Sequence, residues 1–214
     1  MPKLRVHNIA MSVDGYMAGP NQTLDDPMGV GGRGLHEWAF ATQAMRKNFG
    51  MDGGDVGVDN DFIVRGDENI GAHIMGRNMF GPVRGEWPDE SWTGWWGDEP
   101  PYHHEVFVLT HHARPSLSMA GGTTFHFVDD SIESVLEQAF DAAGGADVRI
   151  GGGASTIRQY LGAGLVDELH VAISPIFLGA GERLFGDLGA ALDAYEVVEH
   201  VPSTKATHVV LAKR

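Results

Sequence analysis

The chain has 214 residues, which suits one domain with a sizeable core, and we expect a single domain over 1–214. It carries 15 Lys and Arg against 29 Asp and Glu, and this net charge of −14 disfavours partners such as nucleic acid or anionic membranes. The absence of cysteine excludes disulfides and zinc–thiolate sites, no apolar run approaches the roughly 20 residues of a membrane span, and no signal peptide is recognisable, so we expect a cytoplasmic protein.

Strand-like and helix-like segments alternate in the first half of the chain. Apolar patterning predicts strands at 5–13 and 72–75 and helices at 35–49 and 59–70. The second strand ends at Gly76, and Arg77 follows. Ligands in α/β proteins bind beyond the carboxyl ends of strands, so Arg77 is a candidate contact for an anion, with a solvated surface charge as the alternative.

Residues 81–105 interrupt this alternation as an insertion-like stretch. It contains four of the five tryptophans: Trp87, Trp92, Trp95 and Trp96. Large amphipathic rings suit an aromatic substrate pocket, a subunit contact or packing of the loop itself, and the sequence leaves these alternatives open.

A buried strand at 106–110 (VFVLT) has two histidines before it, at 103 and 104, and two after it, at 111 and 112. At about 3.3 Å per extended residue the two pairs lie on the order of 20 Å apart, so they cannot share a metal ion. We therefore predict no metal there. The basic segment 111–115 is better suited to an anionic cofactor, or to simple exposure to solvent.

The second half continues the same alternation and ends in a hairpin. We expect a strand at 124–128, then a helix in which Asp130 and Glu133 have capping-box spacing and which Gly144 ends. A strand follows at 168–174, and two β-prone segments at 195–201 and 206–212 form an antiparallel hairpin. These elements predict a mixed central sheet with helices on its faces.

Residues 148–160 (VRIGGGASTIRQY) read as a strand, three glycines and the start of a helix. Glycines let a ligand approach bare backbone, and the free N–H groups of the helix favour negative charge. We therefore predict a phosphate or pyrophosphate site. The alternative is a tight turn with positive φ, for which one glycine is usually enough.

Five segments in this order resemble the dihydrofolate reductase-like family, and within it the RibD C-terminal, riboflavin-pathway reductase branch: SVDGYMAG, IMGRNMF, VFVLTHHARP, RIGGGASTIRQYL and LVDELHVAISPIFLGAGERLF. The resemblance implies an α/β fold with a mixed central sheet flanked by helices. It also implies NADPH bound across the carboxyl ends of the strands and a homodimer.

The resemblance also implies roles for particular residues. The cofactor-binding set would be Gly76, Arg77, Thr110, His111, Arg114, Gly151, Gly152, Gly153, Ala154, Ser155 and Thr156. The substrate would contact Ala10, Met11, Asp14 and Tyr16, and Asp14 is the catalytic candidate, although Asp-Gly is also a common turn. Riboflavin reductases usually have Lys at the position of Tyr16 and Glu at that of Ile150, so both substitutions remove charge from the expected ribose-phosphate pocket.

The function that follows is hydride transfer from NADPH to a C=N or C=O group of a small heterocyclic or carbonyl substrate. It would resemble 5-amino-6-(5-phosphoribosylamino)uracil reductase or dihydrofolate reductase. A non-catalytic nucleotide-binding dimeric module of the same fold is the alternative. A Rossmann-type NAD dehydrogenase is disfavoured because the run GGGAST is not G-x-G-x-x-G, and a flavin or deazaflavin in place of NADPH stays open.

Overall fold

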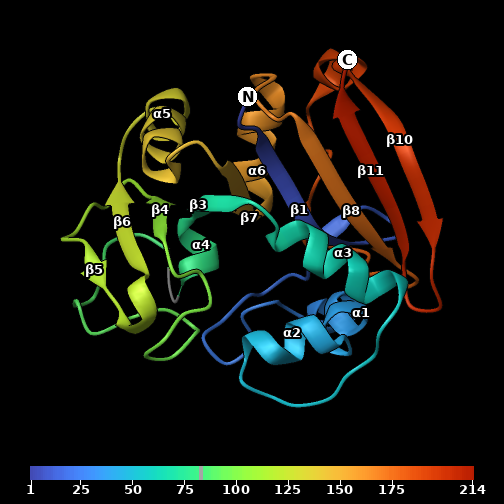
Figure 1. Ribbon diagram of the computed structural model, residues 1–214, viewed down its shortest axis with the longest axis horizontal. Coiled ribbons are helices and arrows are strands. Elements are labelled where there is room, and N and C mark those ends of the chain that lie inside the picture. The colour runs from blue at the N-terminus through green and yellow to red at the C-terminus, as the bar shows by residue number, and fades with distance from the viewer. Residues whose placement is uncertain (82–83) are drawn as a thin grey trace.

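The computed structural model describes residues 1–81 and 84–214 and contains a nine-stranded sheet with the order β10-β11-β8-β1-β7-β3-β4-β6-β5 (Figure 1). The strands of this sheet are β1 (Leu4–Ser12), β3 (Ile70–Gly76), β4 (Glu105–Leu109), β5 (Leu117–Ser118), β6 (Thr124–Val128), β7 (Asp147–Gly152), β8 (Glu168–Ser174), β10 (Tyr195–Pro202) and β11 (Thr207–Lys213). The central strands run parallel, and β11 adds to β8 antiparallel. The predicted mixed sheet with a C-terminal antiparallel hairpin is confirmed.

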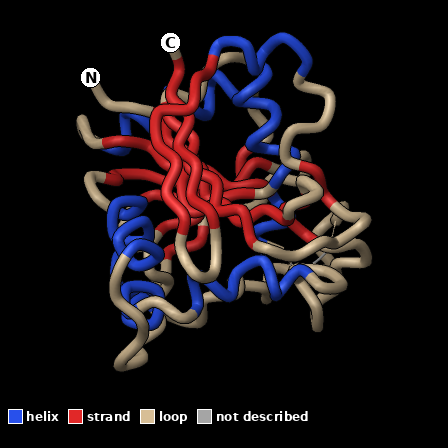
Figure 2. Tube along the Cα trace, turned by 90° about the vertical axis from the view of Figure 1, so that its right-hand side faces the viewer, coloured by secondary structure: helices blue, strands red, loops and turns tan. Residues whose placement is uncertain are grey.

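Helices cover both faces of the sheet (Figure 2). The helices are α1 (Glu37–Phe40), α2 (Gln43–Asn48), α3 (Val58–Asp67), α4 (Arg77–Phe80), α5 (Ile132–Ala143) and α6 (Ala154–Gly162), with 3₁₀ turns η1 (Gly32–His36), η2 (Ala120–Gly122) and η3 (Gly189–Ala194). One face packs on α5 and α6 through a core that includes Val6, Ile74 and Tyr160. A second, two-stranded sheet joins β2 (Tyr16–Ala18) to β9 (Glu182–Arg183). No helix in the described part of the chain is long and apolar enough to cross a membrane.

Two predictions about helices are wrong. The single helix at 35–49 is divided into the end of η1, α1 and α2. Helices α1 and α2 are separate because Thr42 adopts an extended backbone and its hydroxyl caps α2 by accepting from the Met45 N–H. The N-cap of α5 is Ser131, whose hydroxyl accepts from the Ser134 N–H at 3.2 Å, whereas the Asp130 carboxylate accepts from Gln138. The strands at 124–128 and 168–174 have the predicted bounds.

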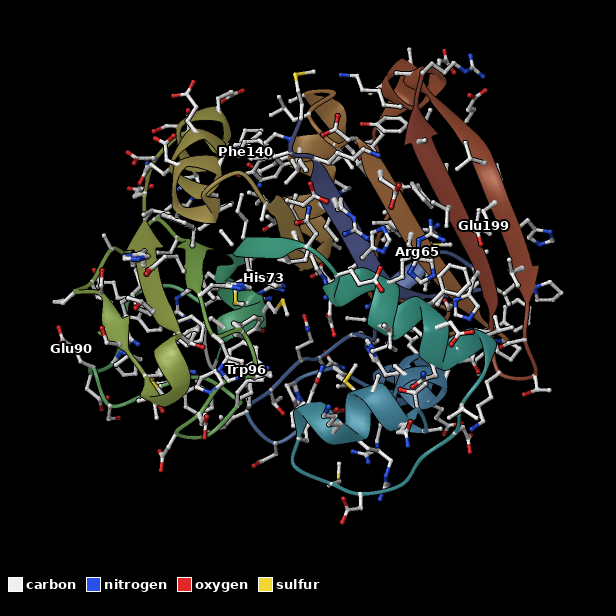
Figure 3. All side chains as sticks on the ribbon, viewed as in Figure 1. Arg65, His73, Glu90, Trp96, Phe140 and Glu199 are labelled. Atoms are coloured by element: carbon white, nitrogen blue, oxygen red, sulfur yellow. The ribbon has the colours of Figure 1, made fainter. Side chains whose placement is uncertain are left out.

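Two arginines on neighbouring strands hold the C-terminal end of α3 against the sheet. Arg5 on β1 is paired with Arg149 on β7. Arg5 donates to the Glu68 and Arg65 carbonyls at 2.9 and 2.8 Å, and Arg149 donates to the Gly66 carbonyl at 3.2 Å. The last carbonyls of a helix lack partners within the helix, so these guanidinium groups satisfy them. On the other side of α3, Arg65 bonds to Glu199 of the outer hairpin at 2.5 Å (Figure 3).

A chain of buried hydrogen bonds lies on the face of the sheet that α3 covers. The Asn8 N–H donates to His170 Nδ1 at 3.1 Å, so His170 Nε2 carries the proton that it donates to His208 Nδ1 at 3.0 Å. His208 Nε2 then donates to the Asp59 carboxylate at 2.7 Å. Both histidine side chains are fully buried, and Phe62 stacks on their rings. Burial lowers the pKa of both, so they are neutral in the folded protein at neutral pH.

Candidate functional site

The carboxyl ends of β1, β7 and β3 lie side by side and bring the predicted glycine motifs together. In the sheet, Met75 pairs with Gly152, so Gly76 stands beside the glycine run. A Cβ on Gly76 would lie 2.4 Å from Thr156 Oγ1, because the first turn of α6 packs directly on the end of β3. Gly76 and Thr156 thus make the close contact that places the start of α6 at this edge.

The three glycines have different surroundings. A Cβ on Gly151 or Gly152 would lie 3.2 Å from the nearest Met79 atom, and Gly152 has φ of 143°. Gly153 has φ of −85° and ψ of −175°, and a Cβ there would meet nothing within 4 Å among the described residues. The alternative of a tight turn with positive φ therefore explains why residue 152 is glycine, but it does not explain Gly153. At Gly153 bare backbone faces open space.

Helix α6 begins immediately after this open backbone. Its N-cap is Gly153, which supplies no side-chain hydrogen bond, and its first turn contains no acidic residue. Ser155 is exposed, whereas Ala154 and Thr156 are buried. The first N–H groups of α6 therefore keep their hydrogen-bonding capacity and the positive end of the helix dipole for an external anion.

Two arginines and a tryptophan stack beyond the ends of β3 and β4. The guanidinium carbons of Arg77 and Arg114 lie 3.1 and 4.3 Å from the Trp87 ring centroid. Arg77 donates to the Gly81 carbonyl at 2.6 Å, and Arg114 donates to the Trp92 carbonyl at 2.7 Å. Burial, and then the charge of Arg114, lowers the pKa of Arg77 to about 10, which still leaves it charged at neutral pH.

Several donors of this arginine pair have no protein partner. Within residues 1–81 and 84–214, Arg77 Nε and Nη2 and Arg114 Nη1 are buried and make no hydrogen bond. A buried charged donor without a partner is costly, and the oxygens of a phosphate would satisfy it. The arginine pair is therefore suited to an anion.

The tryptophan-rich stretch packs onto the sheet, which is the third of the alternatives above. Trp87, Trp92 and Trp96 join the core cluster that contains Phe80 and Phe125, and Trp96 stacks on Phe125 with ring centroids 5.7 Å apart. Residues 82 and 83 of the predicted insertion lie outside the described residues.

Thr110 and His111, in the segment after β4, make hydrogen bonds to other protein groups. Thr110 is buried, and its hydroxyl accepts from the His112 N–H at 3.1 Å. His111 is almost fully exposed and bonds to Asp129 at 2.9 Å. Arg114 is therefore the member of this loop that joins Arg77. Arg158 on α6 does not join this pair and donates to the Arg183 carbonyl.

Asp14 organises the loop that follows β8. Its carboxylate accepts from the Ser12 hydroxyl at 2.6 Å and from the Leu178 and Gly179 N–H groups at 3.1 and 2.7 Å. These hydrogen bonds lower the pKa of Asp14 to about 2, and the bond from Ser12 is the largest cause. A carboxylate ionised at neutral pH suits an acceptor rather than a proton donor, and its direct role in catalysis stays a prediction.

Tyr16, which stands where riboflavin reductases usually have Lys, has the cation of Arg183 beside it. Arg183 Nη2 donates to the Tyr16 hydroxyl at 2.9 Å, and its guanidinium carbon lies 4.5 Å from the Tyr16 ring centroid. The pairing of β2 with β9 brings these residues together. Of the other substrate candidates, Ala10 is buried within β1 and Met11 joins the core on the α5 and α6 side.

The sequence interpretation also missed a histidine pair near the middle of the sheet. His73 on β3 is buried (Figure 3). Its Nδ1 lies 2.6 Å from His104 Nε2. Burial lowers the pKa of both residues, to about 4 for His104. In the described residues, no group of three or more His, Asp or Glu side chains is placed to hold a metal ion.

Comparison with known proteins places these features in a wider context. The family described as the RibD C-terminal domain matches residues 2–208. A protein from Shewanella sp. PV-4 assigned provisionally to riboflavin biosynthesis has a similar structure, with a TM-score of 0.62, 22% identity and 99% coverage of both chains. Dihydrofolate reductase from Enterococcus faecalis, solved with NADP(H), has a TM-score of 0.51 and 15% identity, with 99% of this chain and 96% of that chain covered.

A short stretch is also similar to the uncharacterised protein YyaP of Bacillus subtilis. The two are 46% identical over 44 residues, which span 21% of this chain and 23% of that protein. This match covers less than a quarter of either protein.

Proposed function

Because the chain belongs to the RibD C-terminal domain family, we propose that it is an NADPH-dependent reductase. It would transfer hydride to a C=N or C=O group of a small heterocyclic or carbonyl substrate. The observation that carries the proposal is the open backbone at Gly153 in front of the uncapped helix α6. The complex of Enterococcus faecalis dihydrofolate reductase with NADP(H) supports this choice of cofactor.

The residues at the strand ends fit a dinucleotide phosphate. The Gly153 backbone and the first N–H groups of α6 would hold the diphosphate. The donors of Arg77 and Arg114 that have no partner among the described residues would hold the phosphate on the adenosine ribose. When bound, the nicotinamide supplies the hydride.

The protein's own residues would position the substrate at the end of β1. Arg183 beside Tyr16 provides a cation for a polar or phosphorylated substrate group. The ionised Asp14 would keep the loop after β8 closed against β1 and would accept hydrogen bonds rather than donate a proton. The proton that accompanies hydride transfer would then come from water.

A non-catalytic nucleotide-binding module is the second candidate, and the saturated Asp14 carboxylate favours it. NADPH absorbance recorded with a panel of pterins, aminouracils and carbonyl compounds separates the two functions. The reductase proposal expects NADPH oxidation with at least one class. Tight NADPH binding without oxidation across the panel would favour the second candidate.

The arginine pair predicts a preference for NADPH over NADH. We expect wild type to bind NADPH about tenfold more tightly, a modest ratio because Glu86, Asp89 and Glu90 line a cavity of about 380 Å³ that also includes Arg114. Arg114→Gln should remove this preference and leave NADH affinity unchanged, as measured by isothermal titration calorimetry. The matched control is Arg84→Gln, which removes an exposed arginine from the tryptophan-rich stretch before β4. Equal affinity of wild type for both cofactors would contradict the assignment.

A further inference from the structure

Three adjacent strands bring a serine, a histidine and a glutamate together on the side of the sheet nearest β5. Glu105 begins β4, His126 lies in the middle of β6, and Ser116 immediately precedes β5. Strand β6 lies between β4 and β5 (Figure 1). It pairs parallel with β4 and antiparallel with β5, and in the antiparallel pair Leu117 stands opposite Phe125. By continuation of that register, Ser116 stands opposite His126.

The three side chains form a continuous hydrogen-bonded line. Ser116 Oγ lies 2.9 Å from His126 Nδ1, and His126 Nε2 is bonded directly to the Glu105 carboxylate. An ionised carboxylate can only accept, so Nε2 carries the ring proton and Nδ1 is free to accept from the Ser116 hydroxyl. Phe107 stacks on the imidazole at 5.2 Å and holds its plane. Ser116, His126 and Glu105 are thus placed as a nucleophile, a base and a group that orients the base.

A cavity of about 400 Å³ includes all three side chains. Phe107, Val128 and Ala142 give its wall an apolar part. Ser116 is exposed, so a ligand in the cavity can reach its hydroxyl. The carboxylates of Glu105 and Asp141 disfavour anions there, so the cavity is suited to a small uncharged ligand.

The geometry points to a second catalytic site on this protein, which hydrolyses small uncharged carboxylic esters. Ser116 Oγ attacks the ester carbonyl carbon while its proton passes to His126 Nδ1. Collapse of the tetrahedral intermediate breaks the bond to the leaving oxygen, which takes that proton and departs as an alcohol. Water then attacks the acyl-serine with His126 as base, and the products are the carboxylic acid and free Ser116. Glu105 is a positioning residue that keeps the imidazole in the required tautomer.

The test uses the full-length protein with a fluorophosphonate and with p-nitrophenyl butyrate. We expect the fluorophosphonate to phosphonylate Ser116, as located by peptide mass spectrometry. Loss of the general base in His126→Gln should slow labelling about 100-fold or more. Ser116→Ala should abolish acyl-enzyme formation and the burst of p-nitrophenol. Glu105→Gln should lower kcat with little change in KM, a split that a purely structural role would not produce.

Ser118→Ala is the matched control, because it removes a second exposed serine two residues away that has no bond to His126 among the described residues. It should label and turn over as wild type does, and circular dichroism should show that all variants are folded. Three outcomes would each overturn the proposal: no label on Ser116, equal labelling in His126→Gln, or an unchanged burst in Ser116→Ala.

Discussion

Replacement of Gly153 by valine is expected to lower NADPH affinity about 100-fold, equivalent to about 2.8 kcal/mol, while the protein stays folded. The backbone at Gly153 has φ and ψ values that any residue adopts, and a Cβ there meets nothing within 4 Å among the described residues. The added side chain would occupy the space through which we propose that the diphosphate contacts the backbone. Isothermal titration calorimetry measures the affinity, and urea unfolding measures the stability.

Substitutions at two other glycines serve as comparisons for the Gly153→Val variant. Gly162→Ala, at the exposed C-terminal end of α6, should bind NADPH as wild type does. Gly152→Ala should destabilise the protein, because residue 152 has φ of 143° and a Cβ there would press on Met79. Unchanged NADPH affinity in a folded Gly153→Val variant would contradict the assigned diphosphate site.

Acidification from pH 7.5 to pH 5 is expected to reduce the free energy of unfolding by several kcal/mol. Four fully or almost fully buried histidines have a pKa below the ordinary value of 6.5, with desolvation as the largest cause: His7, His73, His170 and His208. The unfolded chain therefore binds protons below about pH 6.5 that the folded chain does not, and stability falls as pH falls. Each such histidine removes about 2 kcal/mol at pH 5 if it stays neutral when folded.

Urea unfolding at several pH values tests this window. The pKa of Glu168 is lowered to about 2 by its bond to His7, so the stability that it contributes is lost only below about pH 4.5 and does not confuse the measurement. His111→Gln, which removes an exposed imidazole, should keep the full pH dependence. A free energy of unfolding that is constant between pH 7.5 and 5 would show that the buried rings are not neutral.

The parallel strands could be predicted because each is a short apolar run that ends at a glycine or a polar loop. Strand β8 at 168–174 is an example, and the hairpin after it followed from two β-prone segments around a turn. The helix at 35–49 was wrong because apolar spacing continues across Thr42, where a side-chain cap interrupts the backbone. Local pattern does not reveal such a cap when the flanking residues keep helical periodicity.

The parts of the candidate site that could be predicted are those marked by a short continuous motif in the sequence. The glycine run marked the strand-to-helix turn, but only the structure separates Gly153, which faces open space, from Gly152, which a positive φ requires. Arg183 lies 167 residues from Tyr16 in the chain, and its position depends on the pairing of β2 with β9. Ser116, His126 and Glu105 likewise meet only through strand register, which no spacing in the sequence encodes.

A crystal of the protein soaked with NADPH would show where the cofactor binds. We expect the diphosphate against the Gly153 backbone and the first N–H groups of α6, with the 2′-phosphate on the donors of Arg77 and Arg114 that have no partner among residues 1–81 and 84–214. NADPH bound elsewhere on the molecule, with no contact to Gly153 or the start of α6, would disprove the proposed cofactor site.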